Sequence, residues 1–218
     1  MTNAVTPSVD LENAVVLSGG FPLLSGLDLQ LLPGSLTVIT GANGAGKTSL
    51  LRLLAGLVQL SEGSGTVAGI DLKDGDLRQL RRRVGWLGHE GSFYDDLTVR
   101  ENLTFAAKAL DRPLIEIERA LSRVGLSNRI DTITKKLSAG QRRRLGLSWL
   151  LIRRPEIWLL DEPYASLDDE ARTFFDALIA DVLRGGSTVV ISAHDKLKSE
   201  ALQPRTLVLG GGRIVSES

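Results

Sequence analysis

The sequence contains no cysteine, few aromatic residues and no excess of either charge. The absence of cysteine excludes disulfides, thiolate metal sites and cysteine nucleophiles, and it fits a protein of the cytosol. Lys plus Arg equals Asp plus Glu at 26 each. The chain therefore lacks the positive field of a general nucleic-acid binder, and we expect no nucleic-acid partner.

Long hydrophobic runs are also missing. No stretch approaches the roughly 18 consecutive apolar residues of a membrane span, and the first ten residues lack the basic start and apolar core of a signal peptide. We therefore expect any action at a membrane to occur from its surface, through a partner. With 43% apolar residues, the 218-residue chain can bury a substantial core, and we expect one domain over residues 1–218.

What the sequence does contain is a phosphate-binding pattern, G-x-x-x-x-G-K-[ST], matched at every fixed position. The eight residues are Gly41, Ala42, Asn43, Gly44, Ala45, Gly46, Lys47 and Thr48. The apolar run over residues 36–40 predicts a buried strand before them, and residues 49–54 predict a helix after them. An ordinary glycine-rich turn is the alternative, but this flanking pattern favours a nucleotide site that also includes Ser49.

The same loop suggests how phosphate would be bound. Its glycines let backbone N–H groups close around phosphate oxygens, and the helix start adds the positive end of a dipole. Lys47 would reach the β- and γ-phosphates, and the hydroxyl of Thr48 would bind Mg²⁺.

The order of expected elements predicts an α/β fold with a mostly parallel core sheet. Residues 8–32 indicate two strands and a turn, and residues 66–70 one short strand, which together predict an antiparallel N-terminal subdomain. Strands at 84–88, 157–160 and 188–192 and a hairpin at 205–215 would complete the sheets. Helical periodicity between them predicts a helical subdomain inserted at about residues 89–155, and the helix after the phosphate loop is expected to continue through Leu57.

An acidic pair follows one of the buried strands. Asp161 and Glu162 come directly after residues 157–160, at the edge where parallel sheets bind ligands. Asp161 could hold Mg²⁺ together with Thr48, and Glu162 could polarise the attacking water. His194 follows the strand at 188–192 and could contact the γ-phosphate or fix Glu162; a satisfied structural histidine is the alternative.

Two further features have open interpretations. Ser138 precedes an amphipathic helix, so residues 138–141 could either cap that helix or form a second anion site, which one bound nucleotide would not need. Phe21 is the only aromatic residue before the phosphate loop. It could stack on a nucleotide base, or be an ordinary core or turn residue.

Five motifs, whose order along the chain is that of the family, resemble the nucleotide-binding subunits of ATP-binding-cassette (ABC) transporters. Residues 41–48 resemble the Walker A loop, and residues 157–162 resemble the Walker B motif with its catalytic glutamate. Residues 166–168, which include Asp168, resemble the D-loop, and His194 resembles the switch histidine. The signature motif is matched by Leu137, Ser138, Ala139, Gly140 and Gln141. The resemblance implies a head-to-tail dimer, homomeric or heteromeric, in which ATP lies between one subunit's phosphate loop and the other's signature, and a membrane permease as partner.

The sequence departs from the family pattern at two places. The glutamine of the family's Q-loop aligns near His89, so His89 or Glu90 would have to replace its contacts. The usual adenine-stacking aromatic falls near Ser18, which leaves Phe21 as a displaced substitute.

Within the family, the chain is similar to the haem-exporter ATPase subunits of cytochrome c maturation. The resembling segments are the Ser-Gly-Leu at residues 25–27, residues 41–57, residues 87–89, and the signature with Arg142 and Arg143 after it. This implies a peripheral subunit at the cytoplasmic face of the inner membrane. Residues 91–105 would receive a helix of the permease, with plain helix packing as the alternative.

Three functions are compatible with these residues. The first is ATP hydrolysis that drives transport, and the second is a soluble ABC ATPase that acts as an assembly or mechanical factor. The third, a nucleotide-binding scaffold without turnover, is disfavoured because Lys47, Asp161, Glu162 and His194 are all present.

Overall fold

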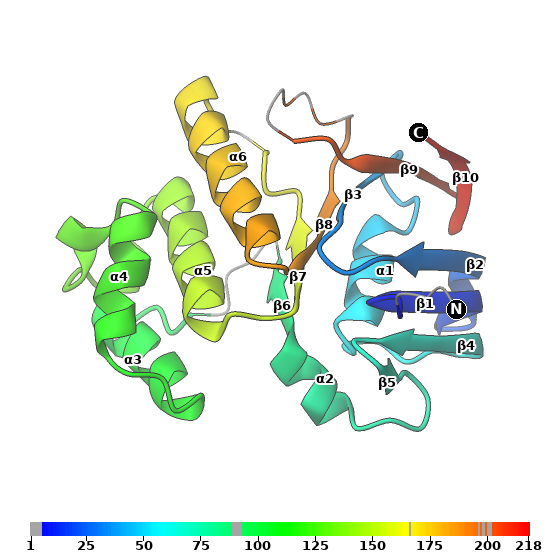
Figure 1. Ribbon diagram of the computed structural model, residues 1–218, viewed down its shortest axis with the longest axis horizontal. Helices are drawn as coiled ribbons and strands as arrows, with labels where there is room; N and C mark the ends of the chain where they lie inside the picture. Colours follow the sequence, from blue (N-terminus) through cyan, green and yellow to red (C-terminus); the bar gives the residue numbers. More distant parts are fainter. Residues whose placement is uncertain (1–5, 89–92, 166, 196, 198, 200–201) are drawn as a thin grey trace, which may run out of the picture. The chain divides into compact units, whose positions relative to one another are not determined.

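The computed structural model describes the chain except for residues 1–5, 89–92, 166, 196, 198 and 200–201. It divides into two compact units, which are considered separately. Met1–Trp86 and Pro155–Ser218 form the core unit, and Leu87–Arg154 form the helical unit (Figure 1).

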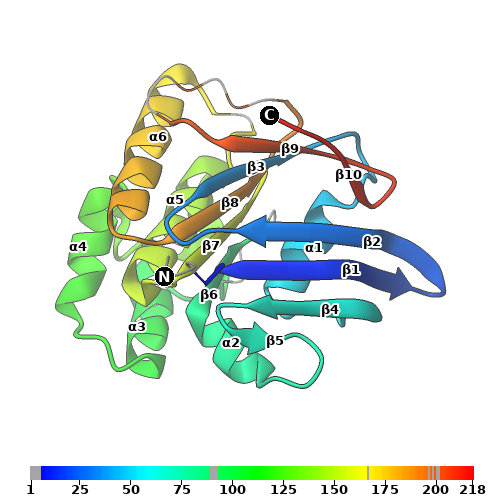
Figure 2. The same ribbon diagram turned by 45° about the vertical axis from the view of Figure 1, so that its right-hand side comes forward.

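The first sheet of the core unit is antiparallel, with the order β2-β1-β4-β5 (Figure 2). Its strands are β1 (Val9–Ser18), β2 (Phe21–Leu31), β4 (Glu62–Val67) and β5 (Ile70–Asp71). The expected two strands and turn over residues 8–32 are confirmed. The prediction of a single strand at residues 66–70 is wrong. The chain turns at Ala68 and Gly69, which both have a positive φ, and Val67 pairs with Ile70. Positive φ at both central residues gives the tight turn that joins twisted hairpin strands.

The second sheet has the order β10-β9-β3-β8-β7-β6. Its strands are β3 (Leu36–Thr40), β6 (Val84–Leu87), β7 (Ile157–Asp161), β8 (Thr188–Ser192), β9 (Arg205–Gly210) and β10 (Arg213–Glu217). Strands β9, β3, β8 and β7 run parallel, and β10 pairs antiparallel with β9. Every residue of β3, β7 and β8 is buried, as the apolar runs predicted for strands covered on both faces.

Three helices belong to the core unit: α1 (Lys47–Leu54), α2 (Leu77–Arg83) and α6 (Asp169–Arg184). Helix α1 contacts strands of both sheets, and its leucines join their common hydrophobic core. The helix ends at Leu54 rather than continuing through Leu57. Gly56 has a φ of 63°, its N–H donates to Leu53 O, and Leu57 N donates to Arg52 O. This pair of bonds is the Schellman ending, which satisfies the last carbonyls and reverses the chain.

The helical unit contains α3 (Val99–Ala109), α4 (Ile115–Arg123) and α5 (Ala139–Arg153), with short 3₁₀ turns η1 (Ser127–Arg129) and η2 (Thr134–Lys136). The three helices contact one another pairwise, which confirms the helical periodicity of this part of the sequence. Within the residues that the structure describes, no helix is long and apolar enough to cross a membrane.

Candidate functional site

The phosphate loop joins β3 to α1 and is pressed against neighbouring backbone. A Cβ atom at Gly41 would lie 2.3 Å from Leu209 O, and one at Gly46 would lie 2.8 Å from Leu23 O. Neither position can therefore carry a side chain without moving main chain. In contrast, a Cβ atom at Gly44 would meet nothing within 4 Å. The loop is thus anchored on its inner side by β9 and β2, while its tip is open.

The start of α1 is suited to an anion. Its N-cap is Gly46, with a φ of 105°, and no described side chain caps the helix. Helix starts leave several N–H groups without partners inside the helix, and a phosphate can satisfy them. The glycine cap therefore leaves these donors for a ligand rather than for a side chain of the protein.

Lys47 is buried at the base of this loop, with 6% of its surface exposed. Its Nζ atom donates to Gly41 O at 2.7 Å and to Ala42 O at 3.2 Å. In the described part of the chain its ammonium group meets carbonyl dipoles but no carboxylate, so its charge is not neutralised by an ion pair. A buried ammonium of this kind provides positive charge at the place where phosphates would bind.

The two expected metal ligands lie together. Thr48 Oγ1 lies 3.0 Å from Asp161 Oδ2 and 3.3 Å from Asp161 Oδ1, and Asp161 is 7% exposed. Hydroxyl and carboxylate oxygens are the donors that Mg²⁺ prefers. No group of three or more His, Cys, Asp and Glu side chains among the described residues could hold a metal. Thr48 and Asp161 could therefore supply two oxygen ligands to Mg²⁺.

Ser192 completes this arrangement, although the sequence predicts only that it belongs to a strand. Its Oγ atom donates to Asp161 Oδ1 at 2.5 Å and accepts from Glu162 N at 2.9 Å. Ser192 is fully buried at the end of β8, and its Cα atom is the parallel partner of Asp161. The available signal was a small hydroxyl residue that ends an otherwise apolar strand.

Glu162 has a left-handed backbone, with a φ of 49°. This region costs residues other than glycine roughly 1–2 kcal/mol, so it needs support from neighbouring groups. The Glu162 N–H points to Ser192, at 2.9 Å from Oγ and 3.2 Å from the carbonyl oxygen. The end of β8 thus holds Glu162 in its turn after β7.

His194 and Glu162 are in contact. His194 Nε2 lies 3.1 Å from Glu162 Oε1, and the two side chains are 51% and 23% exposed. His194 therefore lies at the surface rather than in the hydrophobic core. The structure brings together the two residues whose interaction was expected.

The segment after Glu162 is fixed to α6. Asp168 Oδ1 accepts from Ala171 N at 2.8 Å and caps the helix. The Tyr164 hydroxyl donates to Asp176 Oδ1 at 2.6 Å, and its ring packs edge-on against Phe175. Burial, with a smaller contribution from Asp176, raises the pKa of Tyr164 well above its ordinary range. Ser166, between these residues, lies outside the described residues.

The structure describes Phe21 but not His89. Phe21 is 77% exposed at the start of β2, which excludes a core role. Leu23, two residues later, is the residue whose carbonyl approaches Gly46, so Phe21 belongs to the strand that borders the phosphate loop. His89 and Glu90, at the Q-loop position, lie outside the described residues.

In the helical unit, Ser138 caps α5 as predicted. Ser138 Oγ accepts from Gln141 N at 3.2 Å, and Gln141 Oε1 accepts from Ser138 N at 3.0 Å. Ala139 and Gly140 are exposed, and a Cβ atom at Gly140 would meet nothing within 4 Å. The hydroxyl proton of Ser138 is not used by this capping box, so capping and anion binding are compatible.

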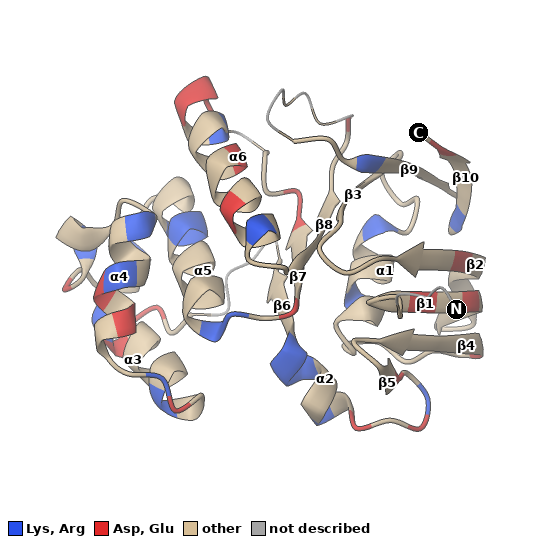
Figure 3. Ribbon diagram, in the orientation of Figure 1, with Lys and Arg blue, Asp and Glu red and all other residues tan. Residues whose placement is uncertain are grey.

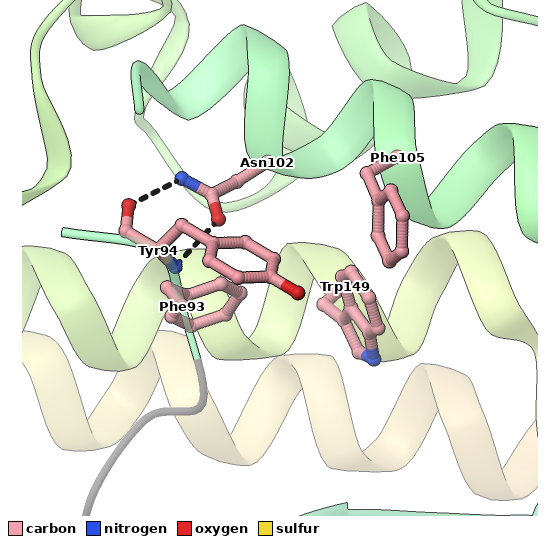
Figure 4. A pocket seen from close by; sticks show the side chains of 5 residues that line it. All are labelled: Phe93, Tyr94, Asn102, Phe105 and Trp149. Carbon is pink, nitrogen blue, oxygen red and sulfur yellow. Dashed lines mark hydrogen bonds between the residues drawn. The ribbon is translucent and has the colours of Figure 1, made fainter. Parts of the chain in front are cut away.

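An aromatic pocket of about 330 Å³ also lies in the helical unit, lined by Phe93, Tyr94, Asn102, Phe105 and Trp149 (Figure 4). The rings meet edge-on in two pairs, Phe93 with Trp149 and Tyr94 with Phe105, each with centroids 6.0 Å apart. Tyr94 and Phe105 are 59% and 58% exposed. The pocket therefore leaves apolar ring surface exposed to solvent.

Asn102 orders one wall of this pocket. Its Oδ1 accepts from Tyr94 N at 2.9 Å. Its Nδ2, which carries two protons, lies 3.0 Å from Tyr94 O, 3.1 Å from Thr98 O and 3.0 Å from Thr134 Oγ1, which share them. Only 2% of Asn102 is exposed. The buried Asn102 side chain thus links the loop before α3 to the start of α3 and to η2 by hydrogen bonds.

Comparison with known proteins agrees with this geometry. A family model described as ABC transporter matches residues 24–165. A cytochrome c biogenesis ATP-binding export protein from Cupriavidus metallidurans is 41% identical over 202 residues, which cover 92% of this chain and 94% of that protein. Another protein described as a cytochrome c biogenesis ATP-binding export protein, from Bradyrhizobium diazoefficiens, is 39% identical, with coverages of 92% and 96%.

Solved structures share the fold. The dimeric post-hydrolysis state of an ATP-binding cassette with ADP and Pi superposes with a TM-score of 0.87 at 23% identity, and covers 96% of this chain and 97% of that one. A bacterial Atm1-family ABC exporter with ATP bound gives a TM-score of 0.83 at 26% identity, and covers all of this chain and 40% of that one. The chain therefore belongs to the ABC transporter family, as an ATP-binding subunit that couples ATP hydrolysis to transport.

Proposed function

We propose that this chain powers an exporter for cytochrome c biogenesis, with haem as the cargo. Two relatives with about 40% identity over more than nine-tenths of the chain are described as cytochrome c biogenesis ATP-binding export proteins, and the sequence resembles haem-exporter subunits. The observation that carries the ATPase part is the cluster of Thr48, Asp161, Ser192, Glu162 and His194, which lies where the strands end.

The roles of these residues follow from phosphoryl transfer to water. Lys47 and the loop amides bind the phosphates, while Thr48 and Asp161 hold Mg²⁺, which would neutralise phosphate charge when bound. Glu162 accepts a proton from the attacking water. His194, 3.1 Å from the Glu162 carboxylate, keeps that group in place or contacts the γ-phosphate. Phe21, exposed on the strand beside the loop, stacks on adenine.

The second anion site suggests a dimer. The core unit and the helical unit act as one nucleotide-binding domain, and residues 138–141 contact a nucleotide bound by another copy or a related subunit. The exposed Ala139 and Gly140 amides and the unused Ser138 proton support this role. Asp168, exposed beyond Glu162, belongs to the same interface.

The permease would bind the helical unit. Residues 93–105 form part of the aromatic pocket, whose exposed rings suit an apolar side chain on a permease helix. Residues 91 and 92 of the expected docking segment lie outside the described residues. This arrangement makes the protein a peripheral subunit at the cytoplasmic face of the inner membrane. Acidic and basic residues are interspersed on α4 and α6 (Figure 3), and we expect no nucleic-acid partner.

The experiment uses the Glu162→Gln variant, tagged and purified from gently solubilised native membranes with ATP present. We expect an ATP-trapped dimer together with a multi-span permease and cytochrome c maturation proteins, identified by mass spectrometry. An unrelated permease would overturn the haem assignment but keep the transporter. Recovery of soluble partners alone would instead favour an assembly factor.

A further inference from the structure

We propose that Ser192 is a positioning residue for ATP hydrolysis, which sets the orientation of both Asp161 and Glu162. The inference rests on the proposed Mg²⁺ and ATP site and adds a residue that binds neither ligand itself. Ser192 is fully buried, and its hydroxyl contacts two consecutive residues of the neighbouring strand end.

The first contact orients the metal ligand. Ser192 Oγ donates its proton to Asp161 Oδ1 at 2.5 Å, while Thr48 Oγ1 lies nearer to Oδ2 at 3.0 Å. Thr48 Oγ1 also lies 3.3 Å from Oδ1, so each carboxylate oxygen has a hydroxyl partner and the rotation of the group is fixed. Groups that hold a metal ligand in this way tune metal binding, and losing one typically costs about 10–100-fold in affinity or activity.

The second contact orients the residue proposed to polarise water. A lone pair of the same Oγ accepts from Glu162 N at 2.9 Å, at a residue whose φ is 49°. Because the left-handed backbone conformation is unfavourable for glutamate, this hydrogen bond helps to hold Glu162 in it. One hydroxyl, with one proton and two lone pairs, therefore serves both acidic residues at once.

Strand β8 offers a matched control. Thr188, at its other end, is also buried and also uses its hydroxyl to accept from a backbone N–H, that of Gly34 at 3.1 Å. It pairs with Ile157 rather than with Asp161. Thr188→Ala therefore removes a buried hydroxyl from the same strand without touching either acidic residue.

The test compares Ser192→Ala, Thr188→Ala and the parent chain, with thermal unfolding, steady-state hydrolysis and ATP affinity measured in Mg²⁺ and in EDTA. For Ser192→Ala we expect kcat and the Mg²⁺-dependent gain in ATP affinity to fall about tenfold or more, with the affinity in EDTA unchanged. Thr188→Ala should lower the melting temperature but keep both quantities. Ser192→Thr, which retains the hydroxyl, should restore most of the loss.

Two results would overturn the inference. One is a Ser192→Ala protein whose kcat and Mg²⁺-dependent affinity stay within about twofold of the parent; the other is an equal loss in Thr188→Ala. If Ser192→Ala does not fold, Ser192→Cys takes its place, because it keeps the side-chain connectivity with a slightly larger and much weaker hydrogen-bonding group. A parent chain that gains no ATP affinity from Mg²⁺ would overturn the proposed site itself, which distinguishes the two failures.

Discussion

The core unit and the helical unit order their candidate functional surfaces by different means. In the core unit, Asp161 and Ser192 are buried and joined by a short hydrogen bond, and Glu162 is held by its backbone. In the helical unit, one buried amide, Asn102, holds a loop in which the ring of Tyr94 remains exposed. Chemistry requires groups fixed before the ligand arrives, whereas a docking surface must leave apolar area uncovered.

The two units also differ in how the charged side chains of their candidate surfaces are placed. The core unit keeps the ammonium of Lys47 buried among carbonyls. Around the loop before α3 in the helical unit, charges are paired at the surface: Asp95 with Arg142, Asp96 with Lys135, and Arg100 with Asp131. Exposed pairs of this kind contribute little to stability. The charge of Lys47 is thus available for the proposed phosphate site, whereas the loop before α3 depends mainly on its buried hydrogen bonds.

The largest expected effect is on hydrolysis. Glu162→Gln keeps the shape of the side chain but removes its ability to accept a proton, so phosphate release should fall about 10²–10³-fold while ATP binding remains. Glu170→Gln, at an exposed position in the first turn of α6, is the matched control and should hydrolyse ATP as the parent does. Undiminished turnover in Glu162→Gln would remove Glu162 from its proposed role.

The phosphate loop and the acidic pair could be predicted from the sequence because each is encoded locally. Residues 41–48 have fixed spacing, and Asp161 and Glu162 directly follow an apolar strand. Ser192 could not be assigned in the same way. Its role depends on the parallel register that places it beside Asp161, and the two residues are separated along the chain by a whole helix.

The misassigned strand at residues 66–70 has another cause. Ala68 takes a φ of 50°, which is unusual for alanine, so the sequence does not mark it as a turn residue. Gly69 alone is compatible with a strand bulge. The aromatic pocket was missed for a similar reason, since Trp149 of α5 and Phe93 meet only after the helices have packed.

A second prediction concerns Asn102, whose loss should destabilise the helical unit without affecting the ATP site of the core unit. Asn102→Ala removes the acceptor of the Tyr94 N–H and the donor to the buried Thr134 hydroxyl, so unfolding should become easier by about 1–3 kcal/mol. Tyr94 O and Thr98 O keep their backbone donors. Hydrogen exchange over residues 93–98 should accelerate, while ATP affinity stays near that of the parent. Asn128→Ala, at an exposed position in η1, is the control for the loss of an asparagine side chain. Equal exchange rates in the two variants would contradict the role of Asn102 as the organiser of the loop.

The next effect is smaller and depends on pH. Tyr164→Phe removes the hydrogen bond to Asp176 and should destabilise the protein by about 1 kcal/mol at neutral pH. Because the folded pKa of Tyr164 is raised, the stability that this residue contributes is complete below its unfolded pKa of about 10 and is lost as the pH rises above it.

The melting temperature of the parent should therefore fall more steeply above pH 10 than that of Tyr164→Phe. Measuring both proteins between about pH 8 and 11 cancels the contribution of the lysines, because the two chains share them. Tyr94→Phe, at a residue that is 59% exposed, controls for loss of a phenol. Parallel pH profiles for the parent and Tyr164→Phe would contradict the buried hydrogen bond.

The smallest effect is expected at the surface of the helical unit. The hydrogen bond from Lys135 lowers the pKa of Asp96, yet both side chains are exposed to solvent. Any stability from this pair is present above the unfolded pKa of Asp96 and disappears as the pH falls through its folded pKa. Asp96→Asn should therefore leave the melting temperature at pH 7 close to that of the parent, and in acid the two proteins should coincide. A loss as large as that of Asn102→Ala would mean that surface charge, rather than the buried amide, holds the loop before α3.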